Sequence, residues 1–234
     1  MEFERIIAIG DTHGMATMLI NLVEQVIKFN PNKDKLVVLG DMVERGPSSK
    51  GVVLYLDALK KRYPENIVLL LGNHEMKAYE SLKSTRTTAT IEDMREPLSW
   101  ILLDGGNETI EEFGGLEPMR QILLPFIESL DVYHEDRNHI FVHGGVPKNM
   151  TDIRNVPIED LLWNRSMDYE GDKTIVVGHS VVREVQQINK IVFCDTGACF
   201  TGKLSAFDII NRRVYWIEDK PAMAWRTNGR LAAK

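Results

Sequence analysis

The sequence feature that most constrains the fold is a short apolar segment that ends abruptly at glycine, aspartate, asparagine or histidine. Five such segments follow one another along the chain: Ile6–Ile9, Leu36–Leu39, Ile67–Leu71, Ile140–Val142 and Thr174–Val177. Uninterrupted apolar runs of this length are typical of strands that are buried on both faces. A sheet built from such strands needs a further layer on each side, so we predict an α/β fold.

Helical patterns separate the first three segments. Apolar residues recur every three or four positions from Met15 to Ile27, and the same spacing occurs less regularly over 52–59. The intervals from Asp11 to Asp41 and from Asp41 to Asn73 each match the length of one strand–helix–strand unit. If these strands are parallel, the polar residues that follow them meet at one edge of the sheet, where α/β proteins bind ligands.

The remaining patterns predict one domain over residues 1–220, built as two sheets in one sandwich. Residues 76–128 are more polar and indicate a helical insertion beside the ligand-binding edge. Two apolar segments, 206–210 and 214–217, predict a strand pair around a turn. Residues 221–234 are expected to form a C-terminal tail.

Composition disfavours several classes of protein. The chain carries 28 basic and 34 acidic residues, a net charge of −6, whereas a nucleic-acid-binding protein is more often basic. Its two cysteines are too few for a disulfide framework or a four-thiolate zinc site. The first residues lack the pattern of a signal peptide, and no apolar run approaches about 18 residues. We therefore expect a cytoplasmic enzyme with no nucleic-acid or membrane partner.

Histidines and hard oxygen ligands gather at the ends of the predicted strands. Four of the six histidines lie there with two aspartates and one asparagine: His13, His74, His143, His179, Asp11, Asp41 and Asn73. Imidazole and oxygen ligands without thiolates suit manganese, iron or zinc. Two ions about 3.5–4 Å apart stabilise both the attacking and the leaving oxygen in phosphoryl transfer. The pattern therefore predicts two divalent ions, with manganese as the first choice and iron or zinc as alternatives.

Five motifs stand at the strand ends: GDTHG at 10–14, GDMVERG at 40–46, GNHE at 72–75, HGG at 143–145 and GHS at 178–180. Taken together they resemble the phosphoprotein phosphatase family of metallophosphoesterases. Trp163–Arg165 and Asp195–Ala198 are similar to later segments of bacterial and phage members, and Trp100–Thr109 is similar to a segment of bacterial serine/threonine phosphatases. The resemblance covers most of the chain and implies a calcineurin-like fold, a two-sheet β-sandwich flanked by helices.

The resemblance implies a ligand set for each of the two ions. The ligands of the first ion are Asp11, His13 and Asp41. The ligands of the second ion are Asp41, which bridges, with Asn73, His143 and His179. A hydroxide that bridges both ions would attack phosphorus in line, and no covalent intermediate is required.

The resemblance also implies roles for residues that bind no metal. His74 protonates the leaving oxygen as a general acid, and Arg45 and Arg165 bind the phosphate, with Asn73 beside them. Glu44 stands where the family usually has an aspartate that pairs with the catalytic histidine. Its longer side chain either reaches His74 as a catalytic partner or points to solvent.

Four functions fit these residues to different degrees. The favoured interpretation is a phosphatase that acts on phosphoserine and phosphothreonine in a phosphoprotein or phosphopeptide. A dinucleoside polyphosphate hydrolase on the same metal core is the alternative, because insertions rather than the core select the substrate. A non-catalytic binding module would have lost ligands, and none is lost. A phosphodiesterase or nuclease is disfavoured by the two arginines and by the acidic net charge.

Overall fold

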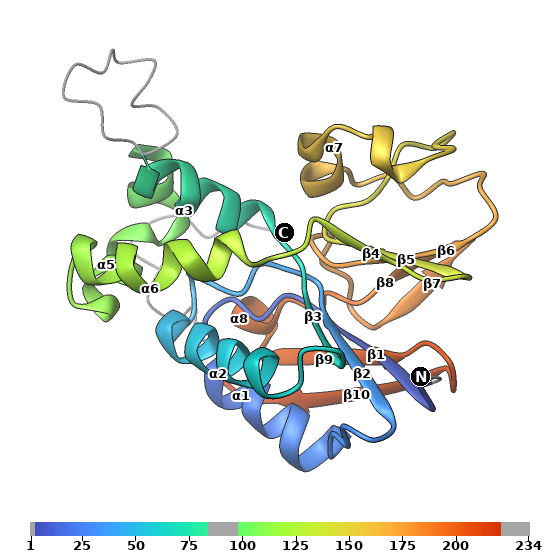
Figure 1. Ribbon diagram of the computed structural model, residues 1–234, viewed down its shortest axis with the longest axis horizontal. Helices are drawn as coiled ribbons and strands as arrows, with labels where there is room; N and C mark the ends of the chain where they lie inside the picture. Colours follow the sequence, from blue (N-terminus) through green and yellow to red (C-terminus); the bar gives the residue numbers. More distant parts are fainter. Residues whose placement is uncertain (1–2, 84–97, 221–234) are drawn as a thin grey trace.

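Two five-stranded sheets face each other in the computed structural model of the protein, in which residues 3–83 and 98–220 are described (Figure 1). Helices pack against the outer face of the first sheet, and α7 (Ile158–Trp163) lies beyond the second sheet. The layers are therefore helices, first sheet, second sheet and a thinner outer layer that contains α7.

The first sheet has the strand order β10–β9–β1–β2–β3. Its strands are β1 (Arg5–Ile9), β2 (Asp34–Val38), β3 (Ile67–Leu69), β9 (Lys203–Asp208) and β10 (Arg213–Glu218). Strands β1, β2 and β3 run parallel, and β9 runs antiparallel to β1. Because the parallel strands end at the same edge, Asp11, Asp41 and Asn73 emerge side by side.

The second sheet has the strand order β4–β5–β6–β8–β7. Its strands are β4 (Tyr133–Glu135), β5 (His139–Val142), β6 (Thr174–Val177), β7 (Gln186–Ile188) and β8 (Ile191–Phe193). Strands β5, β6 and β8 run parallel, so His143 and His179 follow the ends of neighbouring strands. The predicted two-sheet sandwich flanked by helices is confirmed.

Alternate side chains of the strands enter different cores. In β1, Ile7 and Ile9 pack with the helices, whereas Ala8 lies between the two sheets with Phe141 and Val176. A strand with an apolar layer on each face has no polar alternation, which is the physical reason for the continuous apolar runs.

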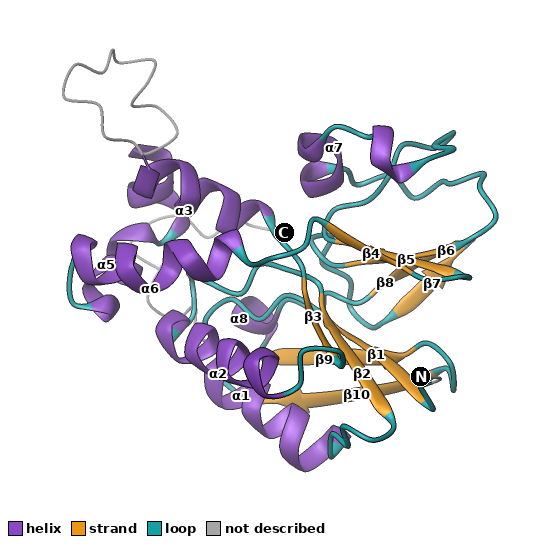
Figure 2. Ribbon diagram, viewed as in Figure 1, coloured by secondary structure: helices purple, strands orange, loops and turns teal. Residues whose placement is uncertain are grey.

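The helices lie on the outer sides of the two sheets, most of them against the first sheet (Figure 2). They are α1 (Ala16–Asn21), η1 (Leu22–Ile27), α2 (Ser49–Arg62), α3 (Asn73–Lys83), η2 (Trp100–Asp104), α5 (Gly106–Phe113), α6 (Leu116–Glu128), η3 (Ile153–Asn155), α7 and α8 (Ala198–Thr201). None of these helices is long and apolar enough to cross a membrane, among residues 3–83 and 98–220. Part of the predicted insertion, 84–97, and the predicted tail, 221–234, lie outside the described residues.

Three local predictions differ from the structure. The helix after β1 turns π-helical in η1, which leaves Val26 38% exposed while Ile27 stays buried. Strand β3 ends at Leu69, before the end of the predicted apolar segment. The N–H of Leu70 still donates to Val38 of β2, whereas the N–H of Leu71 donates to Asp131. Strand β9 ends at Asp208, whose carboxylate accepts backbone N–H groups of the turn that follows.

Candidate active site

The loops after β1, β2 and β6 leave their strands in an unusual backbone conformation. The φ angle is +39° at His13, +48° at Asp41 and +57° at His179. Non-glycine residues in this left-handed region cost on the order of 1–3 kcal/mol each and cluster at functional sites. One glycine allows the loops to meet, because a Cβ on Gly178 would lie 2.2 Å from Asp11 Oδ1.

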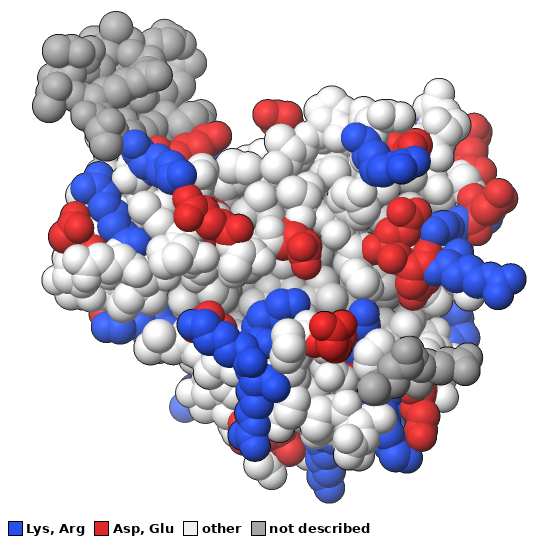
Figure 3. All heavy atoms as spheres, viewed as in Figure 1, with Lys and Arg blue, Asp and Glu red and all other residues white. Residues whose placement is uncertain are grey.

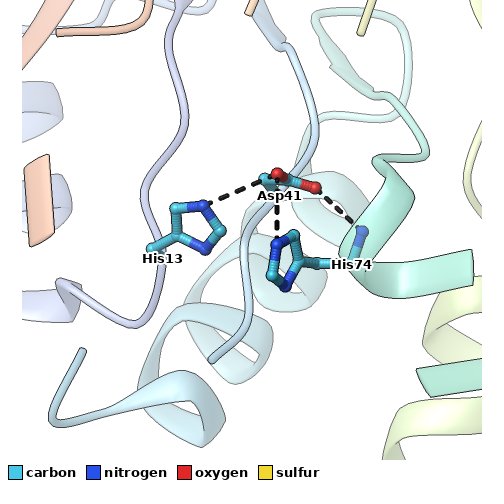
Figure 4. Close-up of side chains that lie close together, drawn as sticks. All are labelled: His13, Asp41 and His74. Carbon is cyan, nitrogen blue, oxygen red and sulfur yellow. Dashed lines mark hydrogen bonds and ion pairs between the residues drawn. The ribbon is translucent and has the colours of Figure 1, made fainter. Parts of the chain in front are cut away.

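Asp41 lies at the centre of the site, with His13 and His74 around it (Figure 4). Its Oδ2 is 3.5 Å from His13 Nε2 and 4.0 Å from His74 Nε2, and its Oδ1 is 3.3 Å from His143 Nε2. Its Oδ1 also accepts a hydrogen bond from the backbone N–H of His74 at 3.0 Å. One carboxylate therefore faces several imidazoles on two sides, the arrangement that a bridging ligand requires.

In the part of the chain that the structure describes, atoms that could bind metal form two groups that share Asp41. One group is His13, Asp41 and His74, the other is Asp41, His143 and His179, and the atoms of each lie within 4.8 Å of one another. His179 Nε2 is buried and has no hydrogen-bond partner among the described residues. A buried nitrogen of this kind needs a partner, and a metal ion would supply one. The residues present therefore fit divalent ions that bind imidazole and carboxylate.

Backbone carbonyl groups orient two of these imidazoles. His13 Nδ1 lies 2.9 Å from the carbonyl oxygen of Val43, and His143 Nδ1 lies 2.7 Å from that of Leu39. With Nδ1–H donating to a carbonyl, each ring turns Nε2 towards Asp41. Metal-binding histidines usually donate their second N–H to such an outer partner, which fixes the ring.

Asp11 lies in the cavity wall but outside both groups. Both of its carboxylate oxygens accept the backbone N–H of His179 at 3.0 Å. Burial, and after it the charge of Asp195, raises the pKa of Asp11 well above its usual range. The structure thus brings Asp11 to the site, while its carboxylate points at the backbone rather than at the other ligand atoms.

Burial and neighbouring charges set the protonation states of the other histidines. Burial, and after it the charge of Arg45, lowers the pKa of His13 well below its usual value. Burial, followed by the charge of His143, lowers the pKa of His179 to about 3. Burial also opposes protonation of His143, but attraction to Asp41 outweighs it and raises that pKa to about 10. Because a metal ligand must be a neutral imidazole, His13 and His179 are already in the required state.

His74 lies between a carboxylate and a guanidinium. Its Nδ1 pairs with Oε2 of Glu44, so the longer glutamate side chain does reach the histidine. Its Nε2 lies 2.6 Å from Arg45 Nη2, and Nη1 of the same guanidinium lies 2.7 Å from His13 Nε2. Burial opposes protonation, but the charges of Asp41 and Glu44 raise the pKa of His74.

The site opens to solvent through a cavity of about 450 Å³. The predicted site residues that line it are Asp11, His13, Asp41, Arg45, Asn73, His74, Arg165 and His179. Glu44 and His143 are fully buried behind this wall, in contact with His74 and Asp41 respectively. Arg165 lies at the exposed side, where its Nη1 donates to the carbonyl oxygen of His179 at 2.8 Å. All the residues singled out in the sequence therefore meet at one place.

Glu75 organises the loop that carries Asp41. Its carboxylate accepts the backbone N–H groups of Asp41, Met42 and Val43 at 2.7–3.1 Å, and that of Gly72 at 3.0 Å. The side chain is fully buried. One carboxylate thus satisfies four backbone donors and ties the loop after β2 to the loop after β3.

Glu75→Gln is expected to destabilise this loop, because the amide turns an N–H donor towards backbone donors. An unpaired buried donor costs about 1–3 kcal/mol. We expect a lower Tm and weaker Mn²⁺ binding, measured by thermal unfolding and by calorimetric titration. Glu184→Gln, the same change at an exposed loop position, is the matched control. Unchanged Tm and Mn²⁺ affinity in Glu75→Gln would show that the four contacts do not hold the loop.

Three residues of this region, Asp195, Lys77 and Asp104, have no role assigned to them from the sequence, although Asp195 begins one of the segments that resemble the family. Asp195 is buried beside Asp11 and lines the cavity, and its Oδ1 accepts the N–H of Gly197 at 2.7 Å. The sequence signal that could have found Asp195 is the same as for Asp11 and Asp41: a short apolar strand that ends at a polar residue. Lys77 and Asp104 form an ion pair of 2.9 Å at the rim. That pair joins α3 to η2, and no local pattern indicates it.

The fold and this site define a class of protein. The profile of the calcineurin-like phosphoesterases matches residues 4–210, so the chain belongs to this family of metallophosphoesterases. The family implies divalent metal ions, which agrees with the two groups of ligand atoms around Asp41.

Individual relatives divide between two substrates. Serine/threonine-protein phosphatase 1 of Salmonella typhimurium is 27% identical over 210 residues, which cover 84% of this chain and 88% of that protein. PrpE of a Geobacillus species, an asymmetrical bis(5'-nucleosyl)-tetraphosphatase, is 25% identical over 230 residues and covers 85% and 88%. A solved serine/threonine phosphatase of Saccharomyces cerevisiae has a TM-score of 0.62 at 19% identity, covering 92% of this chain and 80% of that one. Hydrolysis of a phosphoester is therefore supported for the chain.

Proposed function

We propose that the protein is a manganese-dependent phosphatase that hydrolyses phosphoserine and phosphothreonine in phosphoproteins or phosphopeptides. The observation that carries the proposal is the buried Glu44–His74 pair beside the cavity. The leaving group of a serine or threonine ester is an alkoxide, a strong base that gains from a proton donor. The leaving group of a phosphoanhydride is a much weaker base, so a dinucleoside polyphosphate gains less from such a pair.

The residues of the chain have distinct roles in this proposal. Two divalent ions, when bound, would supply an activated water and neutralise charge on the phosphate. Arg45 and Arg165 would orient the phosphoryl oxygens, because the planar guanidinium binds two oxygens at once. Asn73 Oδ1, 2.9 Å from His143 Nε2, would complete the ligand set on that side.

The proton is moved by the Glu44–His74 pair. With Nδ1 held by Glu44, the Nε2 of His74 is the nitrogen that lies next to Arg45 and Asp41. The raised pKa of His74 favours the protonated form that a general acid needs. We infer that His74 Nε2 donates its proton to the leaving oxygen, while Glu44 holds the ring in place.

The surface charge disfavours a nucleic-acid backbone as the substrate. On the face drawn in Figure 3, Lys and Arg side chains are interspersed with Asp and Glu. A nucleic-acid-binding surface instead gathers basic residues along the path of the phosphates. The net charge of −6 also disfavours binding of a polyanionic nucleic acid.

The deciding experiment compares two substrates in one assay. Metal-stripped protein is reloaded with Mn²⁺ and given a phosphothreonine peptide and diadenosine tetraphosphate at equal concentration. We expect fast release of phosphate from the peptide and little release of adenine nucleotides. The reverse result would assign the chain to the tetraphosphatases, in line with the relatives of that name. Activity on neither compound would overturn both assignments.

A further inference from the structure

Glu44 uses its two carboxylate oxygens for two different partners. Oε2 pairs with Nδ1 of His74, and Oε1 accepts a hydrogen bond from the indole Nε1–H of Trp100. All three side chains are at most 2% exposed. An indole N–H can only donate, so it occupies one oxygen and leaves the other for the histidine.

A glutamate at this position needs such a partner more than an aspartate would. The glutamate side chain has one more rotatable bond than aspartate. Its carboxylate can therefore adopt more orientations, and a smaller fraction of them face His74. The backbone is held separately, because the N–H of Glu44 donates to Ser49 Oγ at 2.8 Å. The indole therefore fixes the part of Glu44 that the backbone contact leaves free to rotate.

The Trp100–Thr109 segment is built to present this indole. Trp100 lies in η2, and the residue six positions later is Gly106, where a Cβ would lie 2.7 Å from Trp100 Cδ2. The hydroxyl of Thr109 donates to the carbonyl oxygen of Gly105 at 2.9 Å and closes the turn between them. Gly106 thus leaves room for the indole, Thr109 closes the turn beside it, and the indole lies against the Glu44 carboxylate.

We propose that Trp100 is a positioning residue for the proton donor: its indole N–H holds Glu44 in the orientation that pairs with His74. The proposal deepens the function proposed above and rests on the role of His74 as general acid. It gives the Trp100–Thr109 segment a role in the reaction, through Glu44, without contact to the substrate. Removal of the N–H should therefore slow only those reactions whose leaving group must be protonated.

The test uses Trp100→Phe, which keeps an aromatic ring and removes the N–H, on phenyl phosphates with leaving groups of different basicity. With phenyl phosphate, whose leaving group is a stronger base, we expect kcat to fall roughly tenfold at unchanged KM. With p-nitrophenyl phosphate we expect a change of less than about twofold, since that leaving group needs little protonation. Equal losses on both substrates would reduce Trp100 to a packing residue and overturn the proposal.

Three further variants make the result specific. Trp216→Phe, the same change at a half-exposed position on β10, should leave both rates unchanged. Gly106→Ala should displace the indole and reproduce the selective loss seen with Trp100→Phe. In a His74→Ala background, Trp100→Phe should cause no additional loss, because its effect passes through the histidine.

An NMR measurement tests the contact independently of activity. In Zn²⁺-loaded protein labelled with ¹⁵N at the indoles, Glu44→Gln should move the Trp100 indole resonance and leave that of Trp216 in place. An unmoved Trp100 resonance would overturn the proposal whatever the enzyme hydrolyses. If the resonance moves and phenyl phosphate shows the selective loss, but the phosphothreonine peptide is not hydrolysed, the positioning role stands. The proposed substrate alone is then wrong.

Discussion

Asp41→Asn is expected to lower Mn²⁺ affinity by more than about 100-fold, because changes even to residues that only orient a metal ligand cost 10–100-fold. Asp41 faces His13 on one side and His143 on the other, so its charge and both oxygens serve both groups of ligand atoms. The amide removes the charge and directs an N–H towards the donor groups around it. Activity should be lost together with the metal.

The measurement is the metal content after gel filtration, combined with a calorimetric Mn²⁺ titration. Asp172→Asn is the matched control, since it makes the same change at an exposed position outside the cavity. Circular dichroism checks that Asp41→Asn folds, because asparagine has nearly the volume of aspartate but leaves the buried imidazoles without their opposite charge. A folded variant that binds two Mn²⁺ ions at wild-type affinity would exclude Asp41 as the bridging ligand.

The sequence predicts the sheet edge well because the signal is local. Each strand enters two apolar layers, so its residues from Ile6 to Ile9 or from Leu36 to Leu39 form a continuous apolar run. Where the run stops, the chain leaves the core, and polar side chains there can face a ligand. The places of Asp11, Asp41 and His143 follow from this rule once the strands are parallel.

The orientation of individual side chains could not be predicted in the same way. Asp11 follows its strand as expected, yet its carboxylate binds the backbone of His179, 168 positions away. The contact of Glu44 with His74 depends on the left-handed backbone of Glu44, with a φ of +69°. It also depends on Trp100, which lies 56 positions further along the chain. Such contacts join segments whose approach is decided by the packing of the whole domain.

Helix registers show the same limit. The spacing of apolar residues predicts the buried stripe from Met18 to Ile27, but the π-helical stretch in η1 rotates Val26 out of it. A change from α-helical to π-helical hydrogen bonding widens one turn, and the apolar residues at 22, 23, 26 and 27 fit an α-helical stripe equally well, so the sequence does not indicate the change. The predicted face is right on average, while one position within it is wrong.

His74→Ala is expected to slow hydrolysis of a phosphothreonine peptide by about 10²–10⁴-fold, the usual contribution of a general acid. Hydrolysis of p-nitrophenyl phosphate should fall much less, because its leaving group departs without a proton. The variant should also keep both metal ions, since the proposed ligands of both ions remain. His134→Ala, on the edge strand β4, is the control for loss of an imidazole elsewhere.

Metal content separates the two roles that the geometry allows for this histidine. His74 Nε2 is 4.0 Å from Asp41 Oδ2, and it belongs with His13 to one group of possible ligand atoms. Its Nδ1, however, is held by Glu44, and its Nε2 faces Arg45, a residue proposed to bind the phosphate, so this nitrogen lies where the substrate would be bound. Loss of one ion in His74→Ala, with equal rate losses on both substrates, would make His74 a ligand and leave the leaving oxygen without its proton donor.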